Sequence, residues 1–279
     1  MVETKSSRGA RITWPLYLLF FLIAGVTGAI ISWGFLTESL AVLGIPDPGP
    51  ITTAGLPLLR AGAWLLAALS VGSFLFASFL LSPRQGDIRR AYLTVDGLIA
   101  SRTGAVAALV FALIGIIMVP LVLSDVSGQS ITEAIKPANW FVALNQVADA
   151  KAWLISAMIA LVVGGAALIA PRTWMWQPVW LVGAILIVAP QGLSGHSAAG
   201  GDHDYGTNSL LWHVLFMMLW VGGLMALIAH GRRLGPSLQL AVRRYSMIAA
   251  TSMVAMAISG VINAAIRVRF EDLFTSDYG

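Results

Sequence analysis

The sequence predicts an all-α membrane protein, a single-domain bundle of about seven transmembrane helices over residues 1–279. Of the 279 residues, 58% are hydrophobic and 11% are charged, and the mean hydropathy is +0.83. Soluble domains carry about 25% charged residues. Several apolar runs also reach the roughly 20 residues that a helix needs to cross the hydrocarbon core. We therefore attribute the formal net charge of +4 to membrane topology, and expect no nucleic-acid partner.

Seven apolar runs, separated by turn signals or polar residues, account for the predicted helices. They cover residues 14–36, 57–81, 104–123, 151–170, 176–194, 208–229 and 245–266. The first run is too long for the apolar region of a cleaved signal peptide. Pro57 is expected to begin the second helix, and residues 171–173 form a tight turn between the fourth and the fifth. Ala68 and Gly72 have the small-residue spacing that predicts close packing against a neighbouring helix.

Three polar features accompany these runs. Residues 82–102, which end at Arg102, are basic and predict a cytoplasmic connection. Residues 124–150 form the longest connection, and their apolar side chains at helical spacing predict a short interfacial helix. Arg60 lies one turn inside the outer end of the second helix, with two roles open: snorkelling to the headgroups, or a counter-charge near a conduction path.

The charge distribution predicts a cytoplasmic amino terminus and an external carboxyl terminus. In this orientation most of the 17 basic residues face the cytoplasm and most of the 13 acids face outwards, as the positive-inside rule requires. His213 then lies one to two turns inside the outer end of the sixth helix, and His230 is expected at the cytoplasmic interface. Four further polar residues fall in an outer loop: His196, Asp202, His203 and Asp204.

The residues at this outer end form the candidate site. The chain has no cysteine, so a metal must use imidazole, thioether or oxygen ligands. His213, Met217 and Trp220 share one face of the sixth helix, and Met256 and Asn263 share a face of the seventh. Matched by depth, His213 is expected near Asn263, and Met217 near Met256. Imidazole and thioether ligands suit copper, and thioethers favour Cu(I).

Structural roles compete with these assignments. A histidine inside a span is a functional candidate by default, because burying a polar group in lipid is costly. Methionine is a common apolar filler, so the methionines of the last two spans are individually expected to pack. His203 lies between two aspartates, and the roles of ligand and of solvated loop residue are both open for it.

A series of short motifs recurs in a characteristic order. The motifs are Gly195-His196-Ser-Ala, Trp212-His213, Leu219-Trp220-Val-Gly222-Gly223-Leu, Arg243-Arg244-Tyr245-Ser246, Ser259-Gly260 and Thr275-Ser-Asp-Tyr278-Gly279. In order and spacing they resemble the copper-resistance membrane proteins of the CopD family. The CopD-like region covers residues 140–279 and is strongest over 193–279. The proline-rich residues 43–50 resemble actinobacterial members, in which such a region is often fused to a cytochrome oxidase assembly domain.

The resemblance implies copper movement from the outer compartment into the cytoplasm, through a multi-pass protein of the bacterial plasma membrane. It puts His196 and His213 on the positions of the family's histidines. Besides membrane lipid, a periplasmic copper carrier or a cytochrome oxidase subunit is an expected partner. In the family a lysine-bearing helix normally follows the Tyr-Gly pair, whereas this chain stops at Gly279. We therefore expect an amino-terminal fragment or a shortened member.

We predict a copper importer or conduit without enzymatic activity, since phosphate-loop, phosphorylated-aspartate and Cys-x-x-Cys motifs are absent from the sequence. In this hypothesis His203, Asp202 and Asp204 collect copper. His196 and His213 then bind it, and Met217 and Met256 receive it, with Trp220 and Asn263 in support.

Two alternatives are open. In the first, His196 and His213 ligate a b-type haem from both sides in an electron-transfer protein. In the second, the protein presents copper for cytochrome oxidase assembly without transporting it. A Soret band would mark the haem protein, and metal binding without flux would mark the delivery factor.

Overall fold

The chain folds into a bundle of long helices. The computed structural model describes residues 48–81, 91–194 and 203–267, together with some positions between 15 and 30. Six helical segments in these ranges are long and apolar enough to cross a membrane: Pro50–Leu80, Val95–Ser127, Ala148–Ile169, Trp174–Ser194, Ser209–Gly231 and Gly235–Ile262. The predicted polytopic helical bundle is confirmed. Most of the expected first span, 14–36, lies outside the described residues, although Gly28 is helical and lies against Ala61.

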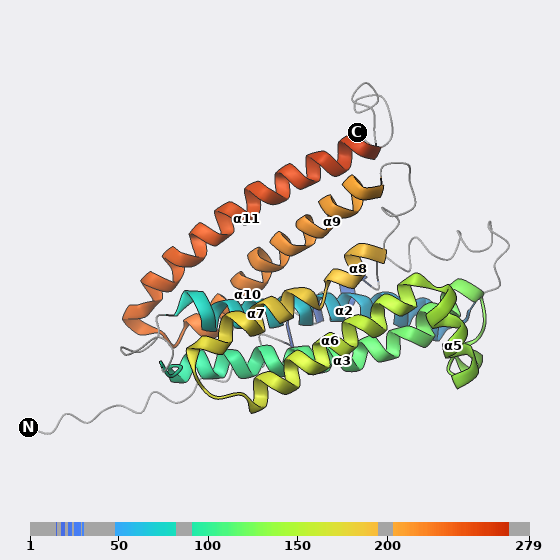
Figure 1. Cartoon of the computed structure of the whole chain (residues 1–279), viewed down its shortest axis with the longest axis horizontal. Helices are drawn as coiled ribbons and strands as arrows, with labels where there is room; N and C mark the ends of the chain where they lie inside the picture. The colour runs from blue at the N-terminus through green and yellow to red at the C-terminus, as the bar shows by residue number, and fades with distance from the viewer. Residues whose placement is uncertain are drawn as a thin grey trace, which may run out of the picture.

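The described chain crosses the bundle six times between two ends (Figure 1). Its elements are α2 (Pro50–Leu75), η1 (Phe76–Leu80), α3 (Val95–Ser127), α4 (Ile131–Ala134), α5 (Pro137–Gln146), α6 (Ala148–Ile169), η2 (Trp174–Trp176), α7 (Gln177–Leu186), α8 (Ala189–Ser194), α9 (His203–Met217), η4 (Met218–Gly222), α10 (Gly223–Gly231), η5 (Gly235–Ser237) and α11 (Leu238–Arg267). We call the end where α2, α6 and α9 begin the Asp149 end. The opposite end, where α10 stops and α11 begins, is the His230 end.

Two helices begin earlier than the sequence predicted. Pro57 lies inside α2, not at its start, because Pro50 already occupies the first helical turn, where a missing N–H costs little. The third span starts at Val95, since the Oγ1 of Thr94 accepts a hydrogen bond from the N–H of Gly97 at 3.1 Å and caps the helix. Arg102 is consequently a residue of α3 and not of the preceding connection.

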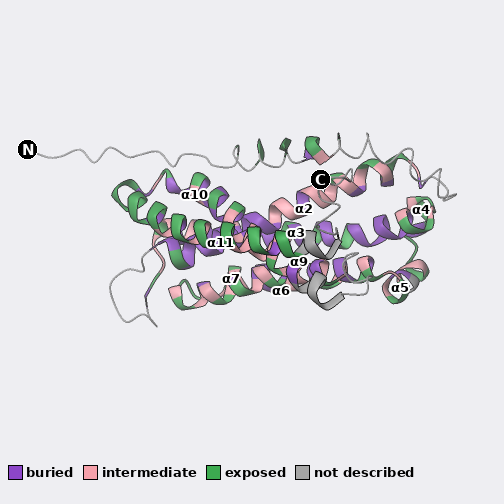
Figure 2. Ribbon diagram, turned by 90° about the horizontal axis from the view of Figure 1, so that it is seen from above, coloured by how far each residue is buried: buried purple, intermediate pink, exposed green. Residues whose placement is uncertain are grey.

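Helices α2, α3 and α6 lie side by side and form the main layer, and α9 and α11 lie together at an angle to it (Figure 1). Small residues bring α3 and α6 close together: a Cβ on Gly115 would lie 2.9 Å from the Cβ of Ala157. The rings of Phe111 and Trp153 stack in the same interface, with centroids 6.1 Å apart. Buried residues concentrate inside the layer, whereas much of α11 is exposed (Figure 2).

Helix α2 also crosses η4 at very close range. A Cβ on Gly72 would overlap the carbonyl group of Gly222, and a Cβ on Gly222 would overlap the carbonyl oxygen of Ala68. The close packing that was predicted for Ala68 and Gly72 is therefore confirmed, and its partner is Gly222. Because glycine and alanine lack bulk, the two backbones meet directly, as small residues allow in membrane helices.

The π-helical turn η4 contains the crossing residue Gly222, and the π-helical turn η1 directly follows α2. Neighbouring side chains hydrogen bond to the carbonyl groups of both turns. The indole N–H of Trp174 donates to the Ser78 carbonyl at 2.8 Å. The hydroxyl of Tyr245 donates to the Trp220 carbonyl at 2.9 Å. An Arg244 Nη1 donates to the Phe79 carbonyl at 3.2 Å. These bonds satisfy carbonyl groups at places where the regular helical pattern changes.

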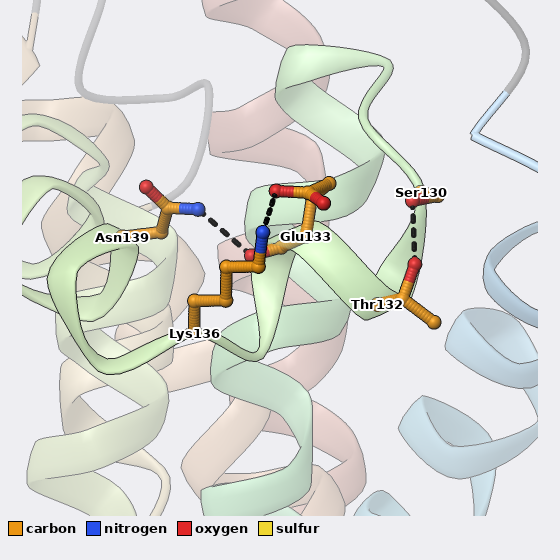
Figure 3. Close-up of polar contacts among 5 residues, drawn as sticks. All are labelled: Ser130, Thr132, Glu133, Lys136 and Asn139. Carbon is orange, nitrogen blue, oxygen red and sulfur yellow. Dashed lines mark hydrogen bonds and ion pairs between the residues drawn. The ribbon is translucent and has the colours of Figure 1, made fainter.

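The connection between α3 and α6 contains the short helices α4 and α5, so the helix expected within residues 124–150 is confirmed. Figure 3 shows its polar contacts: Lys136 Nζ lies 2.6 Å from Glu133 Oε2, and the Asn139 amide donates to the Glu133 carbonyl at 2.7 Å. Trp140 packs against the main core. Phe141 is 74% exposed. Helix α5 therefore has one apolar side chain packed against the core and another that is exposed.

Candidate metal site

His213 lies on α9, about one turn inside the span that begins at Ser209. Its Nδ1 atom is 3.1 Å from the hydroxyl oxygen of Ser259 on α11. The Ser259 hydroxyl in turn donates to the Met256 carbonyl at 3.0 Å. A second hydroxyl, that of Ser209, donates to the Ser259 carbonyl at 2.8 Å. These bonds join α9 to α11 and hold the imidazole in one orientation.

The Ser259 hydroxyl has one hydrogen, and this limits the protonation of His213. When Ser259 donates to the Met256 carbonyl, the His213 Nδ1–H must be the donor in the bond between His213 and Ser259. In a neutral imidazole of this tautomer the lone pair lies on Nε2, to which the described residues offer no hydrogen bond. A metal-binding histidine usually has one ring nitrogen held by a hydrogen bond in this way while the other binds the metal.

The residues of α11 that lie level with His213 are about one helical turn away from the predicted Asn263. His213 is level with Ser259 and Gly260: a Cβ on Gly260 would lie 3.8 Å from His213 Cε1. Asn263 follows one turn later on α11, and the structure describes its backbone only. The difference arises because two inclined helices meet at a depth that their tilt decides, and sequence counting assumes parallel axes.

The two methionines of the candidate site lie on separate helices. Met217 is partly buried and packs against the main core. Met256 is also partly buried, and its carbonyl accepts the hydrogen bond from Ser259. Met218 is 0% exposed, which confirms a packing role, whereas Met253 is 55% exposed. Met217 thus lies one turn from His213 on α9, and Met256 lies one turn from Ser259 on α11.

The other predicted site residues are only partly described. His196 and Asp202 lie outside the described residues, and for His203, Asp204 and Asn263 only the helical backbone is described. Trp220 lies in η4, and its carbonyl accepts the hydrogen bond from Tyr245. Within the described ranges, His, Asp and Glu side chains do not form a group of three or more that could hold a metal ion.

Arg60 is paired across the bundle at the Asp149 end. Its Nη2 lies 2.8 Å from Asp149 Oδ2, which joins α2 to α6, and the two side chains are 42% and 35% exposed. With its amide nitrogen turned toward Asp149, Gln191 of α8 donates to Asp149 Oδ1 at 3.3 Å and accepts from the Trp153 N–H at 3.0 Å. The sequence did not connect Arg60 with Asp149, because 89 residues separate them.

His230 lies in the last turn of α10, at the helix end where it was predicted, and its side chain is buried inside the bundle. The imidazole is 1% exposed, and its ring centroid lies 5.3 Å from that of Phe76 in η1. The aromatic contact explains the burial, since a flat ring fills the space beside the π-helical turn. His230 therefore packs inside the bundle.

No role in the site was predicted for Ser209 and Ser259, the two serines whose hydroxyls join α9 to α11 beside His213. Ser252 and Ser259 are 1% and 5% exposed, seven residues apart on α11. Two serines at that spacing lie on one face of a membrane helix, and small polar residues there favour interhelical contact. This spacing was the available signal for the face of α11 that meets α9.

Comparison with known proteins gives two matches. The family model for the copper resistance protein D-like, N-terminal domain matches residues 51–205, from α2 to the first turn of α9. An uncharacterised protein of Mycobacterium leprae (strain TN) is 27% identical over 195 residues, which are 68% of this chain and 29% of that protein. The chain thus spans less than a third of this relative's length. No solved structure matches the chain.

Proposed function

This chain belongs to the copper resistance protein D-like family, and from that premise we propose that it imports copper through a site at His213. Family membership and the six membrane-competent helices make it a copper-related membrane protein. The observation that carries the finer proposal is the geometry of His213. Its imidazole lies inside a span and its Nδ1 is 3.1 Å from the Ser259 hydroxyl, and we assign metal binding to the other ring nitrogen, Nε2.

Copper is the cargo and enters at the Asp149 end, which the charge distribution predicts to be external. His213 is about 6 Å along the helix from Ser209, where the span begins. The proposal assigns His203 and the neighbouring Asp202 and Asp204 to collecting the ion, and His196 to binding it with His213.

The methionines receive copper below the histidine. Met217 is the next residue on the His213 face of α9, and Met256 lies one turn deeper than Gly260 on α11. Both are partly buried. Thioether ligands select Cu(I), so transfer from imidazole to thioether moves the ion inward without a redox step. The proposal includes no catalytic reaction, and a periplasmic copper carrier is its expected donor.

The membrane potential favours this direction. An inside-negative potential assists entry by about 2.3 kcal/mol per charge per 100 mV. A monovalent cation therefore gains a useful driving force without nucleotide hydrolysis. The proposal needs only a binding site near the outer surface and softer ligands along the path.

An anaerobic Cu(I) titration of the detergent-purified chain against a chromophoric chelator tests the site. We expect tight binding that His213→Ala weakens at least tenfold, because losing even a residue that only orients a metal ligand lowers metal affinity about 10–100-fold. Trp212→Phe is the control, because Trp212 is the neighbouring residue and is 55% exposed. Equal binding by the native chain and His213→Ala would exclude the site.

Copper uptake into proteoliposomes then separates import from delivery. We expect uptake by the native chain and none by His213→Ala. Cu(I) binding without uptake would identify a delivery factor and contradict import. A Soret band in protein from haem-replete cells, lost in His213→Ala, would instead identify a haem protein.

A further inference from the structure

Two hollows near the His230 end of the bundle share Arg102 in their linings. The first is a groove of about 430 Å³ between α2 and α3. Apart from Arg102 and Thr103 it is lined by apolar side chains, namely Leu66, Leu69, Ile99, Val106, Ala107 and Val110. The second, of about 190 Å³, also includes Arg102 in its lining.

The second hollow is a polar pocket between α3, the end of α6 and the start of α7. Arg172 and Ser101 line it together with Arg102. Gln177, which is 2% exposed, also lines it, and its Oε1 has no hydrogen-bond partner within the described residues. The last turn of α6 completes the wall with carbonyl groups that have no partner inside the helix. The pocket thus combines two cations with several hydrogen-bond acceptors.

The backbone holds Arg172 in place. The Arg172 carbonyl accepts a hydrogen bond from the Leu93 N–H at 3.0 Å, and the Trp174 N–H donates to the Ala91 carbonyl at 2.8 Å. Neither Arg102 nor Arg172 forms an ion pair with any described acid. Two cations that have no acidic partner among the described residues therefore line a pocket whose backbone is hydrogen bonded at Arg172 and Trp174.

The depth of the pocket matches that of a lipid phosphate. Helix α3 has 33 residues and is about 50 Å long, which exceeds the roughly 30 Å hydrocarbon core by about 20 Å. If the excess is shared equally, the core begins about 10 Å from Val95, which is the level of Arg102. From Arg102 to Val110 the groove extends about 12 Å further, most of the depth of one leaflet.

We propose that the pocket and the groove form one binding site for an anionic phospholipid whose headgroup carries hydroxyl groups. The phosphate lies between Arg102 and Arg172, and one acyl chain follows the groove along α3. The headgroup hydroxyls donate to Gln177 Oε1 and to the carbonyl groups at the end of α6. If Arg102 and Arg172 only contacted lipid headgroups in general, they would interact with lipid no more strongly than other cations at the same end of the bundle.

Native mass spectrometry of the full detergent-solubilised chain, titrated with single lipids, tests this site. Phosphatidylglycerol is expected to bind more tightly than phosphatidic acid, which lacks headgroup hydroxyls, and phosphatidylcholine is expected to bind weakest. Arg102→Gln and Arg172→Gln are each expected to lower phosphatidylglycerol affinity about fivefold, as about 1 kcal/mol per cation implies. Arg243→Gln is the matched control, because Arg243 is exposed near the same end but lines neither hollow.

A second pair of variants tests the groove. Val106→Trp fills it and is expected to weaken phosphatidylglycerol binding, whereas Val162→Trp, at a 68% exposed position on α6, leaves binding unchanged. Equal affinities for phosphatidylglycerol and phosphatidylcholine would overturn the proposal. So would an equal loss in Arg243→Gln, or displacement of the lipid by inorganic phosphate at a similar concentration, which would indicate a free-anion site.

Discussion

Gly72 of α2 and Gly222 of η4 meet backbone to backbone, so that a Cβ atom on Gly72 would overlap the Gly222 carbonyl group. This crossing joins the main helical layer to the helix that carries His213. The contact is possible only because both residues lack a side chain, and the π-helical turn that ends at Gly222 adjusts the backbone beside it. The position of His213 relative to the main layer therefore depends on two glycines.

Gly222→Ala and Gly72→Ala are expected to destabilise the fold severely. The new methyl group meets backbone and cannot be accommodated by a side-chain rotation, so the cost should exceed the roughly 1–3 kcal/mol of ordinary overpacking. Thermal unfolding in detergent, followed by circular dichroism, measures it. Gly165→Ala is the control, since a Cβ at Gly165 meets no atom within 4 Å. Equal unfolding temperatures for all three variants would contradict the crossing.

Ser259→Ala is expected to weaken Cu(I) binding about 10–100-fold while the chain stays folded, because the ring of His213 loses the partner of Nδ1. Ser259→Thr retains a hydroxyl and should recover part of the affinity. Ser156→Ala is a matched control, since Ser156 is 0% exposed and its hydroxyl has no partner within the described residues. The same chelator titration gives the result. Unchanged affinity in Ser259→Ala would remove the serine from the site.

Met256→Leu is expected to slow copper uptake while binding at His213 persists, because leucine keeps the volume but removes the thioether. Met253→Leu provides the comparison, as Met253 lies three residues earlier and is 55% exposed. Uptake into proteoliposomes and the Cu(I) titration are measured on the same preparations. If both variants transport equally well, Met256 has only a packing role.

Reversing the charge of either Arg60 or Asp149 alone is expected to destabilise the fold. The double variant, in which the two charges are swapped, is expected to keep its stability. Asp149→Arg places two cations together, and the lost charged hydrogen bond costs about 1.5 kcal/mol, at the lower end of the usual range because both groups are partly exposed. Thermal unfolding of Asp149→Arg, Arg60→Asp and the swap tests this. Asp96→Asn is the control, because Asp96 lies in the first turn of α3, at the opposite end of the bundle, and forms no ion pair with a described residue. No recovery in the swap would show that the pair contributes little.

The sequence predicted which candidate residues share a helix face, but it did not predict the contacts between helices. Helical periodicity placed His213, Met217 and Trp220 on one face, because a helix repeats every 3.6 residues wherever it lies. The contact between His213 and Ser259 joins residues 46 apart, and it depends on the tilt of α9 against α11. Likewise Arg60 was placed near the outer end of its helix by the sequence, but its pairing with Asp149 depends on how α2 and α6 both pack against α3.

The fold class, the approximate spans and the close packing at Ala68 and Gly72 could all be predicted from the amino-acid sequence. These features depend on local properties: the length of an apolar run, and the size of side chains along one face. Three other features are visible only in the folded bundle: Gly222 is the partner of Gly72, His230 is buried, and Arg102 and Arg172 share a pocket. The reason is that lipid offers helices no preferred partner, so which faces meet depends on the combined shape of all of them.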